Sequence, residues 1–282
     1  MKKFFPGIFL ALILIFAALP AYAANIQIKV DGVTIMPDVT PDMLHNRTMV
    51  PLRVISENLG AQVNWSDSEV TLLKSDIQVK LKLNDGTAVK NGKNILLDAK
   101  PYIKKNRVMV PLRFLAETLG CNVNYENSVV SVDTEPLVLN SIEVKTLQWE
   151  YHMTMGGVVQ QINGNAFNKA IYDIFLENKG DKTEAPAQYS WMVDIDTVGA
   201  YYKNGQYDFL DQNSNSLQRF DIYSLVESHP AEILAKYPKF LLYDATANQW
   251  YLFNNIAGQS INQLIDTANK NGFLKVISNT VV

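Results

Sequence analysis

The chain has 282 residues, with 25 lysines and arginines against 28 aspartates and glutamates, so its formal charge is −3. This mild acidity argues against a nucleic-acid partner, because such partners normally require a basic face. The single cysteine, Cys121, excludes an internal disulfide, so a chain of this size must rely on its buried cores. The length is sufficient for two domains.

The first residues have the three parts of a secretory signal. A basic start is followed by an apolar run over residues 4–19 and by an A-x-A cleavage motif that ends at Ala23. The apolar run is shorter than the roughly 20 residues that a membrane span needs. We therefore predict a signal peptide at 1–23, a secreted, extracellular or cell-envelope location, and no retained membrane span.

A long segment of the mature chain is written twice. "RTMVPLRVISENLGAQVNW" fills positions 47–65, and "RVMVPLRFLAETLGCNVNY" fills positions 107–125. With a shift of sixty residues and no gap, 18 of 42 positions are identical between 31–72 and 91–132. Such a repeat indicates duplication of one supersecondary unit, and two copies are too few for an open solenoid, so we expect them to share one core.

The elements of the unit follow from its turn and helix signals. "VDG" and "VKNG" predict tight turns between short strands, since Asp-Gly and Asn-Gly tolerate positive φ. A short extended segment then leads into a helix of about nine residues, with Pro51 or Pro111 at its first position and Gly60 or Gly120 as its left-handed stop. An alternating hairpin ends each copy. The unit is therefore ββ-α-ββ, in an α+β fold.

Eight positions define the structural repeat that we predict. The equivalent residues of the two copies are Pro51, Arg53, Gly60, Trp65, Pro111, Arg113, Gly120 and Tyr125. The copies extend over about 26–75 and 77–134, inside a first domain of residues 24–136.

These motifs resemble the copper amine oxidase N-terminal-like domain of bacterial exported proteins. The resemblance covers about residues 26–134 and rests on V-P-L-R, L-G and V-x-[WY] elements in both copies. It implies an α+β accessory module in which antiparallel strands wrap a helix in each unit. In the oxidases that gave the family its name this domain is a stalk, so the resemblance does not imply oxidation of amines.

Amine oxidase chemistry finds little support in the residues. Asn124-Tyr125-Glu126 matches the context in which such oxidases make a quinone, but the equivalent slot of the first copy holds Trp65, so the position calls for a large aromatic. A copper site of that family uses three histidines, two of them one residue apart. The histidines here, His45, His152 and His229, are far apart. We predict no cofactor, no metal and no catalytic residue.

Two further residue types in the first domain have functional alternatives. Arg53 and Arg113 stand in the first turn of their helices and invite an interpretation as anion binders, but each also has a glutamate four residues later, which favours structural pairing. Cys121 is a candidate reactive thiol, yet its counterpart Ala61 indicates a small packed residue.

Residues 137–282 have a different composition and form a predicted second domain. From residue 135 on there are 10 lysines and arginines against 16 aspartates and glutamates, and Trp149, Trp191 and Trp250 all lie here. "IEVKTLQWEYHMTM" alternates as a half-buried strand, and "KAIYDIFLENKGDKTEAP" favours another strand. "PAEILAKY" and "SINQLIDTANKNG" favour helices. We expect a strand-rich, sandwich-like domain with a few helices.

Chemistry in the second domain is hard to find from sequence. "DQNSNS" from Asp211 begins like a calcium loop, but it lacks the glycine and glutamate of an EF-hand. Tyr201, Tyr202 and Tyr207 surround Asn204-Gly205, which predicts a turn. They are candidate ligand-binding residues that would stack on sugar rings, with ordinary strand packing as the alternative.

These observations favour an exported, non-catalytic envelope protein, an accessory or binding module whose partner is wall polysaccharide or another envelope protein. The alternatives are an extracellular hydrolase that acts on wall glycan through carboxylates of the second domain, or a purely structural spacer.

Overall fold

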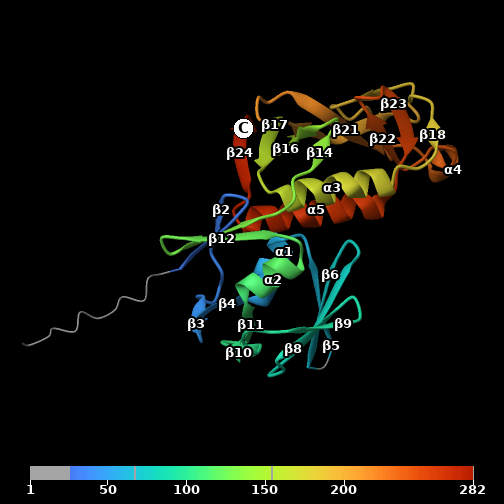
Figure 1. Cartoon of the computed structure of the whole chain (residues 1–282). Coiled ribbons are helices and arrows are strands. Elements are labelled where there is room, and N and C mark those ends of the chain that lie inside the picture. The colour runs from blue at the N-terminus through green and yellow to red at the C-terminus, as the bar shows by residue number, and fades with distance from the viewer. Residues whose placement is uncertain (1–25, 67, 154, 282) are drawn as a thin grey trace, which may run out of the picture.

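The computed structural model describes residues 26–281 except 67 and 154, and it is a mixed structure rich in strands. The signal peptide predicted at 1–23 lies outside the described residues. Figure 1 shows the duplicated half below and the C-terminal half above, with two long helices between the lower half and the upper sheet. The expected α+β class is confirmed.

Each copy of the repeat holds six strands and one helix. The first copy comprises β1 (Gln27–Val30), β2 (Val33–Ile35), β3 (Asp42–Leu44), β4 (Arg47–Pro51), α1 (Leu52–Asn58), β5 (Gln62–Ser66) and β6 (Glu69–Lys74). The second comprises β8 (Thr87–Lys90), β9 (Lys93–Leu96), β10 (Tyr102–Lys104), β11 (Arg107–Pro111), α2 (Leu112–Thr118), β12 (Asn122–Glu126) and β13 (Val129–Asp133). An extra strand, β7 (Ile77–Lys82), joins the copies.

The structure has two more strands per copy than the predicted ββ-α-ββ unit: β4 and β11 lie where a short extended segment was expected before each helix, and β3 and β10 were missed. They form the hairpins β3–β4 and β10–β11, whose turns lie at His45-Asn46 and Lys105-Asn106 with positive φ. Asparagine tolerates this conformation better than most residues, so the turns form without the glycine that marks the predicted ones.

The two copies interlock through their sheets. In the duplicated half, the first strand, β1, pairs in parallel with the last strand, β13. Strand β4 of the first copy pairs with β11 of the second. A third sheet runs in the order β5-β6-β7-β8-β9, so it also joins both copies. Leu52 and Ile55 of α1 and its C-cap residue Leu59 are buried in one cluster. The equivalent residues of α2, which are Leu112, Leu115 and the C-cap Leu119, belong to the same cluster. This is the shared core that duplication predicts.

Both short helices end in the same way. The N–H of Gly60 donates to the carbonyl of Glu57, and the N–H of Ala61 donates to that of Ser56, at 3.1 and 2.9 Å. Gly120 and Cys121 repeat these bonds at the same lengths. Both glycines have positive φ, so each helix closes in a Schellman motif.

The helix starts differ from the prediction by one residue. Pro51 and Pro111 are the N-cap residues, with ψ of 117° and 123°, and not the first helical residues. Each proline is also the last residue of a strand, because β4 and β11 pair up to that point. The helices have seven residues each.

The C-terminal half is built on one sheet, which contains nine strands within the described part of the chain. Its strands are β16 (Thr146–Met153), β17 (Gly156–Ile162), β18 (Lys182–Thr183), β19 (Tyr189–Ser190), β20 (Tyr201–Leu210), β21 (Ser216–Leu225), β22 (Phe240–Asp244), β23 (Gln249–Leu252) and β24 (Leu274–Asn279). A small hairpin, β14 (Val138–Leu139) and β15 (Ile142–Glu143), precedes it.

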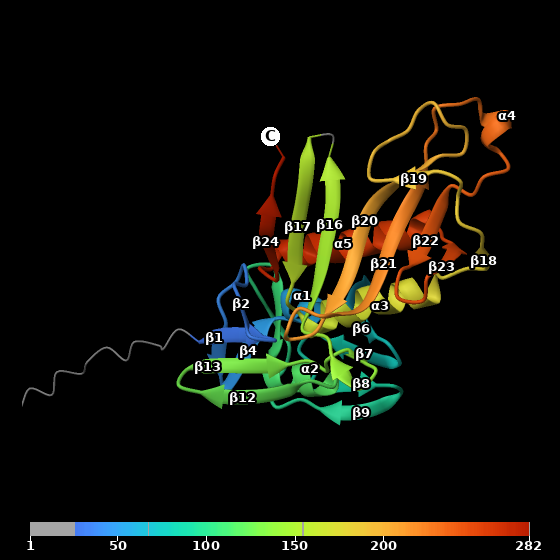
Figure 2. The ribbon, with the colours of Figure 1, turned by 90° about the horizontal axis from the view of Figure 1, so that it is seen from above.

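Helices α3 (Asn165–Glu177) and α5 (Asn255–Lys270) lie side by side along one face of this sheet, as Figure 2 shows from above. The sandwich-like expectation was therefore wrong, since helices and not a second sheet cover that face. Helix α4 (Ala231–Leu234) lies at the far end. The helices expected near α4 and α5 are confirmed.

The strand predicted over residues 169–186 was wrong, because most of its apolar residues belong to α3. Phe167, Ile171 and Phe175 are buried at intervals of four residues, which is a helical spacing. The prediction began at Lys169 and so omitted Phe167, which would have completed this stripe.

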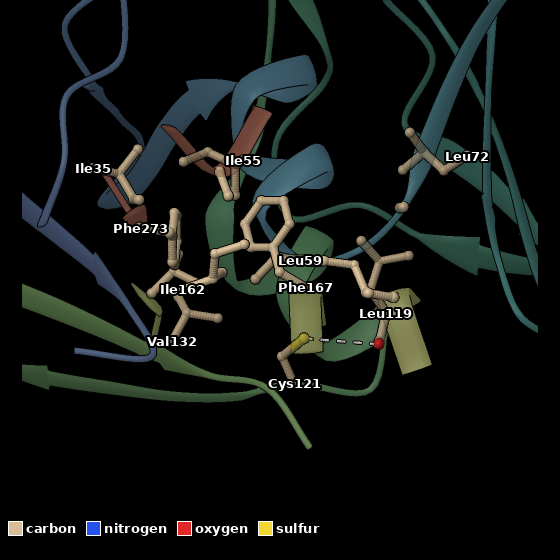
Figure 3. Close-up of a cluster of buried hydrophobic side chains, with 14 of the residues drawn as sticks. Ile35, Ile55, Leu59, Leu72, Leu119, Cys121, Val132, Ile162, Phe167 and Phe273 are labelled. Atoms are coloured by element: carbon tan, nitrogen blue, oxygen red, sulfur yellow. Dashed lines mark hydrogen bonds between the residues drawn. The ribbon is translucent and has the colours of Figure 1, made fainter. Parts of the chain in front are cut away.

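The two halves share buried side chains. The ring centres of Phe167 on α3 and Phe273 before β24 lie 5.0 Å apart. Both rings belong to the same buried cluster as Ile55 of α1 and its C-cap residue Leu59 (Figure 3). A polar contact lies beside them: the carboxylate of Asp31 accepts hydrogen bonds from Thr134 and from the first N–H of α3. The domain boundary near residue 136 stays a prediction. Buried side chains on both sides of it belong to one hydrophobic cluster.

Candidate functional site

The three tyrosines predicted to surround a turn lie instead on a continuous strand, β20. Tyr201 is 2% exposed and Tyr207 is 3% exposed, whereas Tyr202 is half-buried. The hydroxyl of Tyr201 donates to the carbonyl of Pro238 at 2.6 Å. Two of the three rings are therefore covered by protein, so the tyrosines do not form an exposed aromatic platform.

Asn204-Gly205 is a β-bulge and not a turn, which explains the error. The register of β20 against β21 shifts between Lys203 and Gly205. A Cβ at Gly205 would lie 2.9 Å from the indole Nε1 of Trp149, so a side chain there would collide with that ring. Glycine inside a strand often marks such a close approach.

Trp149 belongs to a row of aromatic rings on the helix-facing side of the sheet. Trp149 and Tyr151 stand two residues apart on β16, so they face the same side, and Tyr207 is opposite Trp149 in the register. The ring centre of Trp149 lies 4.6 Å from that of Tyr151 and 6.4 Å from that of Tyr207. Trp149 and Tyr151 are half-buried, so part of each ring remains accessible.

A polar stripe of α5 forms the opposite side of a groove. Asn255, Gln259, Asn262 and Asp266 recur at helical spacing and line this space, together with Asn254. The side chain of Asn254 also caps α5, accepting the N–H of Ala257 at 2.8 Å. We call the space between this stripe and the aromatic row the Trp149 groove. Its volume is about 550 Å³.

Gly258 lines the Trp149 groove from the second turn of α5. Glycine inside a helix costs roughly 0.5 to 1 kcal/mol relative to alanine. A Cβ at Gly258 would meet no heavy atom within 4 Å, and its φ lies outside the left-handed region. Neither packing nor backbone conformation requires glycine here. Its effect is to leave the groove open where a side chain would fill it.

The Trp149 groove offers hydrogen-bonding groups and little charge. Of the described residues that line it, Asp266 is the one ionisable at neutral pH. The indole N–H of Trp149 is buried and has no hydrogen-bond acceptor among the described residues, although the Tyr207 hydroxyl is nearby. Burial raises the pKa of Tyr207 above its ordinary value, so the phenol stays neutral. Such a lining suits an uncharged ligand with many hydroxyls.

Several carboxylates of the C-terminal half lie on the other face of the sheet. Asp221 is 1% exposed and bonds Lys203 at 2.8 Å, and Arg219 lies within 3.3 Å of it. Asp208 accepts a hydrogen bond from Ser216, and burial raises the pKa of this carboxyl. These groups are committed to pairs across β20 and β21.

The other residues singled out from the sequence are spread over the molecule. His45 lies in the β3–β4 turn, His152 pairs with Glu150 at 2.8 Å, and His229 lies beside Ser228. The Asp211 carboxylate accepts the N–H groups of Asn213 and Asn215, and so closes its own loop.

Cys121 is buried, and burial raises the pKa of its thiol even though Lys74 lies 3.9 Å away. Figure 3 shows its sulfur directed at the Leu119 carbonyl, inside the core. This is the packed position that Ala61 predicts, since Ala61 is also buried.

The repeat residues Arg53, Trp65, Arg113 and Tyr125 lie at the surface, in two hollows of the duplicated half. Trp65 and Tyr125 are 43% and 41% exposed. The sequence predicted that both rings are packing residues at the end of a strand. Their exposed fractions show that only part of each ring is packed.

Sequence reasoning missed the Trp149 groove, although it identified both of its walls. It placed Trp149 and Tyr151 on one face of a strand and predicted the helix that contains Asn262 and Asp266. It lacked the pairing of strands that brings residues about a hundred positions apart together. The Asn- and Gln-rich face of α5 did not reveal the groove by itself, because a helix that covers a core ordinarily has polar residues on its other face.

Comparison with known proteins identifies the duplicated half. Residues 29–134 match the family model of the copper amine oxidase N-terminal domain. This confirms the resemblance for that part of the chain and indicates a non-catalytic accessory domain. The match does not extend to the C-terminal half.

A curated relative is a protein named "Protease inhibitor" from Brevibacillus choshinensis, 26% identical over 142 residues. The alignment covers 50% of this chain and 44% of the relative. No solved structure matches the chain. Within the described residues, the helices are too short or too polar to cross a membrane.

Proposed function

We propose that this protein is an exported, non-catalytic envelope protein that binds uncharged stretches of cell-wall polysaccharide in the Trp149 groove. The observation that carries the proposal is the aromatic row of β16 and β20 facing the amide stripe of α5. Sugars bind by laying the apolar faces of their rings on aromatic side chains. Their hydroxyls then exchange hydrogen bonds with amide groups, which both donate and accept.

The export part of the proposal rests on the N-terminal sequence. The basic start, apolar run and A-x-A motif are those of a secretory signal. The duplicated accessory domain is consistent with an envelope role. Fractionation of cells that express the full chain, with mass spectrometry of the mature N-terminus, tests this part. The account expects a chain that starts near Ala24 outside the cytoplasm.

Binding is favoured over hydrolysis by the distribution of carboxylates. Glycoside hydrolases normally use a pair of carboxyl groups on either side of the scissile bond. Asp266 is the one carboxylate among the described residues that line the Trp149 groove. Asp208 and Asp221 lie on the opposite face of the sheet and have their own partners.

Incubating the mature protein with insoluble wall material separates the three functions considered. A binder sediments with the material and releases no soluble fragments, a hydrolase releases fragments, and a spacer does neither. We expect sedimentation without fragments. The Trp149→Ala variant should lose most of this binding, because removing an aromatic anchor typically costs about 2 kcal/mol or more.

A second candidate function, protease inhibition, is favoured by one segment of the C-terminal half. Met192, Val193 and Ile195 are more than half exposed on residues 190–198, at the end of the sheet away from the duplicated half. Local hydrogen bonds hold this segment: Met192 N–H donates to Ser190 Oγ, and Ser228 Oγ donates to the Ile195 carbonyl. A held, exposed, apolar segment is what an inhibitor presents to a protease cleft.

The name of the Brevibacillus choshinensis relative adds to this second candidate. Its test is residual activity of chymotrypsin-like and subtilisin-like proteases at increasing concentrations of the mature chain. Inhibition that Met192→Asp abolishes would favour this function. Rapid cleavage at the segment without inhibition would contradict it.

A further inference from the structure

The duplicated half has two surface hollows that are related by the repeat. The first is lined by Arg53, Trp65, Asn106 and Arg107. The second is lined by the equivalent residues Arg113, Tyr125, Asn46 and Arg47. Their volumes are about 640 and 410 Å³. Each hollow combines the helix and following strand of one copy with the hairpin turn of the other, because β4 and β11 pair across the copies.

The aromatic residue of each hollow keeps an accessible face. Trp65 is 43% exposed and Tyr125 is 41% exposed, on β5 and β12, which are the edge strands of their sheets. A single exposed aromatic needs no explanation. Here equivalent positions of the two copies both carry an exposed aromatic side chain, although many other equivalent positions hold different residues. Packing uses only part of each ring, so the other part is available to a ligand.

Only one arginine of each hollow is held in a close ion pair. Arg107 bonds Asp38 at 2.6 Å, and Arg47 bonds Asp98 at 2.7 Å, so these crossed pairs join the two copies. The helix arginines are different. Arg113 has an exposed contact of 3.8 Å with Glu117, and within the described residues Arg53 has no carboxylate within 4.0 Å.

In the second hollow, the helix arginine lies over one face of the aromatic ring. The guanidinium carbon of Arg113 is 4.9 Å from the ring centre of Tyr125. Both hollows also contain carboxylates. Asp38 and Glu57 line the first together with Lys270, and Glu126 lines the second. Three positive and two negative side chains in the first hollow, and two positive and one negative in the second, leave a formal charge of +1 in each.

We propose that each hollow binds one acidic sugar unit of a polysaccharide, with the ring face on Trp65 or Tyr125 and the carboxylate on Arg53 or Arg113. Guanidinium matches a carboxylate through two parallel hydrogen bonds. This goes beyond the function proposed above, because it uses the other half of the chain and an anionic ligand. Two sites on one chain also hold one polymer more tightly than either site alone.

Calorimetric titration of the mature chain with short galacturonate oligomers tests the proposal. We expect two equivalents per chain for the wild type, with Arg53→Ala and Arg113→Ala each reducing this to one and the double variant to none. Lys93→Ala, which removes one exposed charge from the same half, is the matched control and should keep both sites.

Two comparisons separate recognition from simple charge attraction. The methyl ester of the same oligomer keeps the sugar ring and loses the charge, so it should not bind. The double variant Arg53→Lys with Arg113→Lys keeps the positive charges but cannot donate two parallel hydrogen bonds to one carboxylate. Its affinity for the oligomer should therefore fall about tenfold. Both arginines are exposed, so these variants should keep the circular-dichroism spectrum of the wild type.

Some results would overturn the proposal. They are an unchanged stoichiometry in the double alanine variant, equal binding of the methyl ester, or full affinity of the lysine variants. Its failure is distinguishable from failure of the Trp149 groove, because Trp149→Ala should leave galacturonate binding unchanged.

Discussion

Tyr201 and Tyr207 lie on opposite faces of β20, although their positions differ by six, so an unbroken strand would place both side chains on one face. The bulge at Lys203 and Gly205 adds a residue to the strand, and an added residue moves the following side chains to the other face. Tyr201 therefore joins a small cluster with Tyr223 and Trp250, and Tyr207 joins the main core.

Alanine substitution distinguishes core tyrosines from surface ones. We expect Tyr207→Ala to lower the free energy of unfolding by about 3 to 5 kcal/mol, as large-to-small changes of buried aromatics do. Tyr202→Ala should cost about 1 kcal/mol or less, because that ring is only half-buried. Urea denaturation measures both. Similar small losses for the two variants would contradict the burial of Tyr207.

The carboxyl of Asp244 should contribute to acid sensitivity. Burial on its own raises the pKa of this group, but hydrogen bonds from Lys179, Ala247 and Gln218 hold it below the ordinary value. A carboxyl with a lowered folded pKa adds stability above its unfolded pKa of about 4 and loses it as pH falls through the folded pKa.

The free energy of unfolding should therefore fall more steeply below pH ~4 for the wild type than for Asp244→Asn. At neutral pH the variant should be the less stable protein, because Lys179 loses its 2.7 Å partner. If the free energy of unfolding depended on pH in the same way for both proteins, the Asp244–Lys179 pair would contribute nothing to the acid sensitivity.

Helix ends were the elements that the sequence predicted best. Proline and glycine restrict the backbone locally, so Pro51 and Gly60 mark the ends of α1 whatever the rest of the chain does. Helix α3 was missed because its apolar residues suit either a strand or a helix, and only the Phe167, Ile171 and Phe175 stripe decides between them. The hairpin turn at His45-Asn46 carries no glycine and gave no signal.

The two helix-stop glycines allow a paired prediction. Both have a φ near +80°, so alanine is strained at either position. At Gly60 the new Cβ would also lie 3.3 Å from that of Ala166 on α3, whereas at Gly120 it would meet nothing within 4 Å. Gly120→Ala should cost about 1 kcal/mol and Gly60→Ala more. Thermal denaturation ranks them, and a reversed order would contradict the packing of α3 on α1.

At the scale of the whole molecule, the halves are joined through Phe167, Phe273 and the Asp31 carboxylate. We expect residues 24–136 to fold alone with a cooperative melt, at a lower Tm than the full chain, because Ile55 and Leu59 lose these neighbours. A single repeat should not fold, since β1 pairs with β13 and β4 with β11. A truncated chain without a cooperative transition would contradict this.

The Trp149 groove exists only at this scale, which is why sequence patterns did not reveal it. Its aromatic wall comes from β16 and β20, and its polar wall comes from a helix near the end of the chain. Periodicity identifies the faces of each element. It does not say that these faces lie opposite each other, because that depends on the order of strands in the sheet.

Gly258→Leu tests the central claim most directly, because it fills the groove and should also strengthen the helix. Gln263→Leu is its control, an exposed position of the same helix outside the groove lining. Calorimetry with neutral oligosaccharides released from wall material should show binding by the wild type and Gln263→Leu, and at least about tenfold weaker binding by a folded Gly258→Leu. Equal affinity of all three proteins would contradict the assignment of the Trp149 groove.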